Sequence, residues 1–331
     1  MSHLLTLVGA ALCGAFLCAQ DPGPGDAAAP RRAVLVTGAS SGIGRATAEL
    51  LARNGFFVYA GARKQADLDA LDAIEHVQAL RLDVTVQADI DAAVATVRSA
   101  GRGLYGLVNN AGVLVVGPLI ELREQDLAFQ LDVNVYGPYR VTKAFAPLLI
   151  DSKGRVLTTG SLSGTVCWPM GGAYCISKHA VDAFTDVLAQ ELRPFDVGVG
   201  VVEPGNFRSE IMTNMKERLE SAGYTTEGSR YRERLDSMLE RPAGRDEYPA
   251  PDAVAQAFLT ALTAEQTPRR RLVVPNRREA EVTVRAAIAR LVELSVGHEF
   301  ALDREQLVAM LDEELQRQRA AAGDGGPARA R

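Results

Sequence analysis

The chain has few of the side chains from which disulfide frameworks and metal sites are built. Its 331 residues contain 4 cysteines and 4 histidines. Cys13 and Cys18 lie in an apolar N-terminal run, and the remaining pair, Cys167 and Cys175, shows no zinc-ligand spacing. Because the histidines are scattered as well, we expect neither a disulfide framework nor a bound metal.

An excess of positive charge is also lacking, since 36 Lys and Arg residues stand against 41 Asp and Glu residues. The net charge is −5, so the chain offers no wide basic field of the kind that binds nucleic acid. The run at residues 269–271 is locally basic, and we interpret it as a solvated edge. We therefore expect no nucleic-acid partner.

An apolar run at residues 4–19 precedes the body of the chain. It is short for a bilayer span, is long enough for a signal-peptide core, and has no Lys or Arg before it. A stretch rich in Pro, Gly and Ala follows. We interpret residues 1–32 as a hydrophobic leader and flexible linker, for which secretion, membrane anchoring and a mis-called start codon all stay open.

From Ala33 onward, short apolar runs alternate with amphipathic helical patterns such as residues 44–55 and 87–101. Nearly continuous hydrophobic strands are typical of a parallel sheet that is covered on both faces. The pattern predicts an α/β fold over residues 33–275: a doubly wound, Rossmann-type, seven-stranded parallel sheet with helices on both faces. The predicted strands are residues 33–38, 56–61, 77–84, 105–112, 154–161, 197–205 and 271–275.

Two further helical patterns follow, at residues 279–294 and 304–316. We expect residues 276–318 to form a C-terminal helical extension and residues 319–331 a disordered tail. The second pattern has an apolar face, which we expect to dock on the main domain rather than on a partner. This face consists of Leu307, Met310, Leu311 and Leu315.

The first predicted strand runs into a glycine-rich turn and then into a helix. Gly38, Gly42 and Gly44 allow a tight turn whose backbone amides approach a pyrophosphate at the positive helix N-terminus. The stretch also matches the G-x-S-x-G turn of hydrolases, but that turn follows several strands, whereas one strand precedes this turn. The placement therefore favours dinucleotide binding.

The end of the second strand distinguishes the two nicotinamide dinucleotides. A carboxylate there would bind the ribose 2′-hydroxyl of NAD and repel the 2′-phosphate of NADP. Residues 58–65 contain no acid, and Arg63 and Lys64 place two cations near that position. NADP(H) is favoured, and NAD(H) stays open because both side chains can also point into solvent.

Tyr174 and Lys178 lie four residues apart in a helical pattern, so their polar ends can meet at one point. A neighbouring ammonium favours the phenolate and lowers a tyrosine pKa whose ordinary value is about 10. The apolar stripe that we expect to pack toward the sheet consists of Ile176, Ala180, Phe184, Val187 and Leu188. Upstream, Ser161 ends the fifth strand, and Asn134 lies in a long apolar helix, where an amide is costly unless it is hydrogen-bonded.

With these residues the chain resembles the short-chain dehydrogenase/reductase family over residues 33–275. The N-terminal segment and the long C-terminal part are similar to those of its hydroxysteroid and retinol dehydrogenase branch. The motifs stand in the order and spacing of the family. They are T-G-x-x-x-G-I-G at residues 37–44, N-N-A-G at 109–112, Asn134, Ser161, Y-x-x-x-K at 174–178, and P-G at 204–205.

The resemblance implies an NAD(P)-dependent oxidoreductase that interconverts an alcohol and a ketone or aldehyde. Tyr174 would be the general acid/base, and Lys178 would lower its pKa and bind the nicotinamide ribose. Ser161 would hydrogen-bond the substrate oxygen, and Asn134 would support a proton relay through a water.

The resemblance also implies cofactor contacts along the carboxyl ends of the strands. Asp83 would bond the adenine with Val84 close by, Pro204 and Gly205 would close around the nicotinamide, and Asn109 would be structural. The other implied cofactor-binding residues are Gly38, Ser40, Ser41, Gly42, Ile43, Gly44, Arg63, Asn110, Ala111 and Gly112, together with Tyr174 and Lys178.

The segment after the sixth strand covers the substrate in such a fold, and here it is apolar at helical spacing. We therefore expect a lipophilic, steroid-like, retinoid-like or long-chain substrate. Packing of this segment on the domain would explain the same pattern and stays open. The residues concerned are Phe207, Ile211, Met212, Met215 and Leu219, with Trp168, Met170 and residues 113–116 as further lining.

Assembly, location and turnover are the remaining expectations. The resemblance implies a homodimer or homotetramer through the helices that bear Asn134 and Tyr174. NADP chemistry favours the cytoplasm, whereas residues 4–19 favour a membrane or export. A non-catalytic NADP-binding sensor or scaffold is the alternative to an enzyme.

Overall fold

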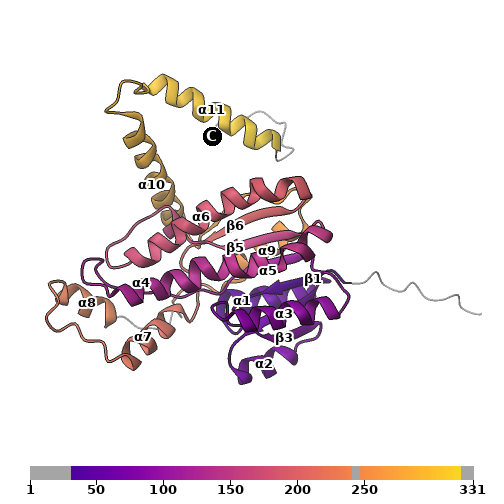
Figure 1. The fold of residues 1–331 in the computed structure, drawn as a ribbon. Coiled ribbons are helices and arrows are strands. Elements are labelled where there is room, and N and C mark those ends of the chain that lie inside the picture. Colours follow the sequence, from indigo (N-terminus) through magenta and orange to yellow (C-terminus); the bar gives the residue numbers. More distant parts are fainter. Residues whose placement is uncertain (1–30, 241–246, 322–331) are drawn as a thin grey trace, which may run out of the picture. The chain divides into compact units, whose positions relative to one another are not determined.

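The computed structural model describes residues 31–240 and 247–321. Its centre is one seven-stranded sheet of order β3-β2-β1-β4-β5-β6-β7, in which every neighbouring pair is parallel (Figure 1). The predicted fold class is thus confirmed. The strands are β1 (Ala33–Val36), β2 (Phe57–Ala62), β3 (Val77–Arg81), β4 (Gly106–Asn109), β5 (Arg155–Thr159), β6 (Gly198–Pro204) and β7 (Arg270–Val273).

Helices cover both faces of the sheet because successive side chains of a strand point to opposite faces. Val34 and Val36 of β1 pack in one core with α1, α2 and α9, whereas Ala33 and Leu35 pack in a second core with α3, α5 and α6. The helices are α1 (Gly42–Arg53), α2 (Gln65–Asp72), α3 (Gln87–Ser99), α4 (Glu124–Leu131), α5 (Gly137–Asp151), α6 (Gly172–Leu192), α7 (Ile211–Ser221), α8 (Arg232–Leu239), α9 (Asp252–Thr263), α10 (Arg277–Ser295) and α11 (Arg304–Ala321).

The order of the strands reverses between β1 and β4. On one side of this point the chain proceeds outward to β2 and β3, and on the other side to β5, β6 and β7. Right-handed crossovers then place the connecting helices on opposite faces, which leaves a crevice outside the carboxyl ends of the strands.

The face of α6 that packs on the sheet differs from the predicted stripe. The buried residues are Val181, Thr185, Ala189 and Leu192, which continue the face that buries Lys178. Ile176 and Val187 of the predicted stripe are 43% and 54% exposed. The prediction was wrong for these two residues, although Leu188 of the stripe does pack against the core on this face of the sheet. Both faces of the helix are apolar, and the narrower one, with Thr185 and Ala189, allows the closer approach to the strands.

The C-terminal helices are present, as predicted, but the face of α11 is not covered. Met310, Leu311 and Leu315 are exposed, so the prediction that they dock on the main domain is wrong. The helix also continues to Ala321, beyond residue 318. None of the helices in the described part of the chain combines the length and apolarity needed to cross a bilayer. Residues 1–30 of the predicted leader and linker, and the predicted tail from residue 322, lie outside the described residues.

Candidate functional site

A cleft of about 680 Å³ opens at the carboxyl ends of the strands. Every site residue predicted from the sequence lines it: Asn134, Ser161, Tyr174 and Lys178, and each predicted cofactor contact from Gly38 to Gly205. Lys64, by contrast, is exposed and does not belong to the lining. The structure therefore brings together residues that lie up to 167 positions apart (205 − 38).

The glycine turn between β1 and α1 is held by Asn110, the residue that follows β4. The side-chain amide of Asn110 donates to the carbonyl oxygens of Thr37 and Gly38, both at 3.0 Å, and Thr37 Oγ1 accepts from the Asn110 N–H at 2.9 Å. Gly38 has a φ of +63°, and a Cβ at Gly44 would overlap the Gly38 carbonyl. The N-terminus of α1 thus faces the cleft with room for an anion against its backbone, which fits a dinucleotide pyrophosphate.

Tyr174 and Lys178 meet in the cleft on the first turns of α6. The Lys178 ammonium donates to the carbonyl of Thr159 at 2.8 Å and lies 5.6 Å from the centroid of the Tyr174 ring. Burial lowers the pKa of Lys178 to about 8, against the opposing charge of Asp182. A cation beside the phenol, with little water around it, can stabilise a phenolate.

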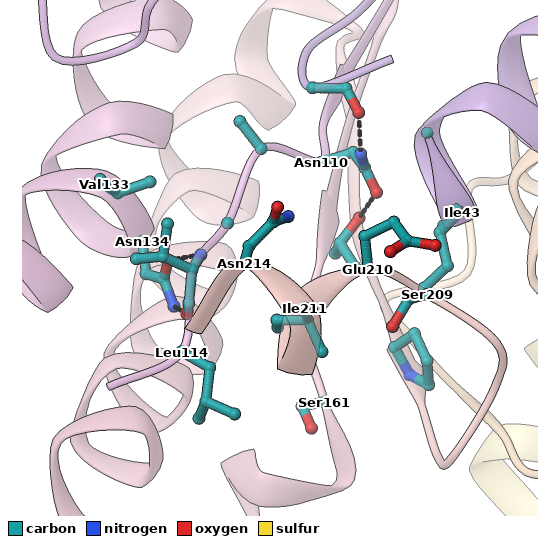
Figure 2. Close-up of a pocket in the computed structure, with 18 of the residues that line it drawn as sticks. Ile43, Asn110, Leu114, Val133, Asn134, Ser161, Ser209, Glu210, Ile211 and Asn214 are labelled. Atoms are coloured by element: carbon teal, nitrogen blue, oxygen red, sulfur yellow. Dashed lines mark hydrogen bonds between the residues drawn. The ribbon is translucent and has the colours of Figure 1, made fainter. Parts of the chain in front are cut away.

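Ser161 follows β5 and begins a short 3-10 turn, Leu162–Gly164. Its Oγ accepts from the Ser163 N–H at 3.1 Å, which orients the side chain. That bond uses an oxygen lone pair, so the hydroxyl proton can be donated to a ligand oxygen in the cleft. Ser161 lies on the same cleft as Asn110 and Asn134 (Figure 2).

Asn134 lies in a π-helical turn, Asp132–Tyr136, which separates α4 from α5. Its Oδ1 accepts from the Val113 N–H at 2.8 Å, while its Nδ2 donates to Val113 O at 3.0 Å and to Ser177 Oγ at 3.1 Å. One helical turn earlier, Gln130 bonds Val113 O and the Val115 N–H in the same way. The amide predicted to need partners is fully bonded, and π-helical turns are frequent at functional sites.

Arg63 and Asp83 form the far end of the cleft, after β2 and β3. They approach each other to 3.7 Å, and Asp83 also accepts from the Thr85 N–H and hydroxyl at 2.9 and 2.7 Å. Burial raises the pKa of Asp83, but the hydrogen bonds from Thr85 and the charge of Arg63 outweigh it, so the net shift is downward. The carboxylate is ionised, and the Arg63 side chain remains largely exposed to the cleft mouth.

The N-terminal end of α7 contributes lining that includes both predicted and unpredicted residues. Ile211 lines the cleft together with Glu210 and Asn214, as Figure 2 shows. Met215 and Leu219 do not line it; they pack behind the lining, against Leu114 and Val116. One part of this apolar pattern therefore lines the cleft, and another part packs on the domain.

Several lining residues were missed by the sequence reasoning. Ser209 stands between Arg208 and Glu210 and carries no signal, whereas Asn214 directly precedes Met215 of the apolar pattern, which is a weak signal. Glu247 and Tyr248 follow a stretch without helical or strand periodicity and carry no signal. The missed polar residues of the lining include Thr159, Asn206, Ser209, Glu210, Asn214, Glu247 and Tyr248.

Comparison with known proteins identifies relatives of this chain. A family model described as short chain dehydrogenase matches residues 32–220. The chain is 38% identical over 204 residues to the mitochondrial D-beta-hydroxybutyrate dehydrogenase of Rattus norvegicus, covering 59% of this chain and 60% of that protein. It is 41% identical over 191 residues to retinol dehydrogenase 7 of Rattus norvegicus, covering 56% of this chain and 59% of that protein. Both matches span less than two thirds of the relative's length.

A solved structure is similar as well. The short chain dehydrogenase/reductase from Burkholderia phymatum in complex with NAD aligns with a TM-score of 0.68 at 28% identity. The alignment covers 79% of this chain and 95% of that chain, so the likeness extends beyond the part that the family model matches.

Replacement of Asn134 by alanine tests the amide network. The variant leaves Val113 N–H and C=O without these partners, and we expect the free energy of unfolding to fall by about 3 kcal/mol. Ser177→Ala removes a single bond to the Asn134 amide, and we expect a loss of about 1 kcal/mol. Urea denaturation measures both, and equal losses in the two variants would contradict the network as described.

Proposed function

We propose that this chain, which belongs to the short-chain dehydrogenase/reductase family, is an NAD(P)-dependent oxidoreductase that interconverts an alcohol and a ketone or aldehyde. The observation that carries the proposal is the joint placement of Tyr174, Lys178 and Ser161 in one cleft with the glycine turn of α1. The NAD bound to the similar Burkholderia phymatum protein supports a nicotinamide cofactor.

In the proposed reaction, the nicotinamide would supply or accept the hydride when bound, and side chains of the protein would transfer the proton. In the direction of reduction, the Tyr174 hydroxyl gives its proton to the substrate oxygen and is left as a phenolate. Lys178, held by Thr159 O beside the ring, stabilises that phenolate. Ser161 donates to the same substrate oxygen as negative charge develops on it. Asn134 holds the segment that begins at Val113. We include in this proposal a proton relay through a water, which Asn134 would support.

The substrate that we propose is lipophilic and without a carboxylate close to the reacting group. Leu114, Trp168, Ile211 and Met212 give the cleft an apolar wall beside Tyr174. The charged residues in the described lining are Arg63, Asp83, Lys178, Glu210 and Glu247. Since Arg63 lies at the β2 end and Lys178 beside the phenol, neither is placed to bind a substrate carboxylate, which makes retinol-like ligands a better fit than hydroxybutyrate.

The proposal is tested by comparing the turnover of the native chain with that of the Tyr174→Phe variant. NADPH and NADH absorbance is followed with steroid, retinoid, long-chain and small carbonyls, including acetoacetate. We expect consumption with the lipophilic carbonyls, and a fall in kcat of about 10²–10⁴-fold in Tyr174→Phe, since the general acid is lost. Tyr224→Phe, outside the cleft lining, is the control.

Two outcomes would contradict parts of this proposal. Cofactor binding that is unaltered in Tyr174→Phe, with no consumption by the native chain on any carbonyl, would favour the sensor or scaffold. Equal turnover of lipophilic and small polar carbonyls would remove the lipophilic substrate while leaving the reaction in place.

We also propose that NADP(H) is preferred over NAD(H), on the ground of Arg63 at the cleft mouth and no acid at the end of β2. Arg63→Ala should raise the dissociation constant of NADPH about tenfold and leave that of NADH unchanged, because one charge-assisted bond to the 2′-phosphate is lost. Lys64→Ala, outside the lining, is the matched control. A tighter complex of the native chain with NADH than with NADPH would refute the preference.

The proposed assembly is a homodimer or homotetramer through the outer faces of α5 and α6. Tyr139 and Tyr136, on α5 and the turn before it, are exposed, as are Ile176 and Val187 of α6. Val187→Glu should reduce the mass measured by light scattering to that of a monomer, whereas Val308→Glu on α11 should not. An unchanged mass in Val187→Glu would exclude α6 from the interface. Membrane association through residues 4–19 stays a prediction, since that segment lies outside the described residues.

A further inference from the structure

The turn at residues 204–206 leaves β6 and lines the cleft at all three positions. Its backbone is held from outside the cleft by two bonds. The Gly205 N–H donates to Val273 O of β7 at 2.8 Å, and the Asn206 N–H donates to Glu279 Oε2 of α10 at 2.9 Å. Both acceptors come from the C-terminal third of the chain, beyond residue 220, where the family-model match ends.

The Glu279 side chain is itself fixed at the start of α10. Asn276 caps the helix: its Oδ1 accepts from the Glu279 N–H at 3.0 Å, and its Nδ2 donates to Glu279 Oε1 at 3.1 Å. One carboxylate oxygen thus bonds the cap and the other bonds the turn. A carboxylate held in this way gives a charge-assisted bond that costs little further side-chain entropy.

Gly205 provides a second, independent sign of this contact. A Cβ built at Gly205 would overlap Glu279 Oε2 and would lie 3.0 Å from Val274 Cγ1. The φ angle of Gly205 is not positive, so the conformation of its backbone does not require glycine. The close approach of the carboxylate accounts for a residue without a side chain at this position.

We infer that Glu279 is a positioning residue, which sets the turn at residues 204–206 against the nicotinamide end of the cleft and so makes α10 part of the cofactor site. The inference rests on the proposed function, since it assigns the turn to the bound cofactor. Glu279 does not line the cleft and touches no reacting atom; it acts through the Asn206 N–H. Its loss therefore weakens cofactor binding more than it slows the chemical step.

Three substitutions at Glu279 in the full chain separate this role from simple helix capping. Glu279→Ala removes the acceptor. Glu279→Asp keeps the charge and suits the first turn of a helix, but is one methylene too short to reach Asn206, so it serves if the alanine variant folds poorly. Glu279→Gln keeps one acceptor oxygen and replaces the other by an NH2 donor, so it can accept from the Asn206 N–H or from Asn276 Nδ2 but not from both. Glu281→Asp, on the exposed side of the same helix where Glu281 pairs with Arg277 at 2.6 Å, is the control.

The readouts are cofactor affinity, kinetics and thermal stability. Trp168 is the single tryptophan of the chain and lines the cleft, so quenching of its fluorescence reports NADPH binding without turnover. We expect the dissociation constant and the KM for NADPH to rise about tenfold in Glu279→Ala and Glu279→Asp, with kcat within about threefold of native. Glu279→Gln should give an affinity between those of Glu279→Ala and the native chain, and Glu281→Asp should not alter the native affinity.

The result that would overturn the inference is a dissociation constant in Glu279→Ala and Glu279→Asp equal to that of Glu281→Asp. A lower melting temperature with unchanged NADPH affinity would do the same, because it would reduce Glu279 to a helix cap. If the native chain bound no nicotinamide dinucleotide, the proposed function and this inference would both fall. Native binding and turnover with no effect at Glu279 would remove this inference alone.

Discussion

The cleft depends on the contact between β1 and β4, where the strand order reverses. Each strand ends there in a turn, and the two turns run toward opposite faces of the sheet. Asn110 ties them together by bonding the carbonyls of Thr37 and Gly38, while the Thr37 hydroxyl accepts from the backbone of Asn110 and Ala111. These bonds satisfy backbone groups that no neighbouring strand can reach, and they keep the crevice open. The glycine turn, the cleft mouth at Arg63 and the pair Tyr174 and Lys178 on α6 are all positioned relative to this junction.

The second constraint is the burial of a lysine beside the phenol. An ammonium in dry surroundings is costly, and burial shifts the Lys178 pKa toward neutrality. The Thr159 carbonyl accepts a hydrogen bond from this ammonium, so β5 holds the cation at its end, two residues before Ser161. The same strand end therefore sets the position of Lys178, and with it the Tyr174 phenol, relative to Ser161. Tyr174 and Ser161 are the two groups that would act on one substrate oxygen. The rest of the inward face of α6 follows, since Val181, Thr185 and Ala189 lie on the side that buries Lys178.

Local sequence patterns predicted most of the fold and of the candidate site. The strand, glycine turn and helix from Ala33 to Arg53 are adjacent in the chain, so periodicity and residue type predict both the element and the cleft side of Gly38 and Gly44. The choice between two apolar faces of α6 depends on how closely α6 approaches the sheet, which no window of sequence contains. Contacts such as Asn206 with Glu279, 73 residues apart, join a turn to a helix start and leave no periodic signal. The exposed face of α11 shows the same limit, because apolar spacing predicts a face but not its neighbour.

The π-helical turn before α5 has a consequence for chain length. Asp132–Tyr136 holds one residue more than an α-helical turn would, and each residue of a helix rotates it by about 100°. Gln130 and Asn134, on either side of its start, both present amides to the extended segment at residues 113–115, as a neighbouring strand would. Deleting one residue there would preserve the composition and apolar pattern of α5 yet turn α4 and α5 out of phase. At this position the spacing of the amides is constrained as tightly as their chemistry.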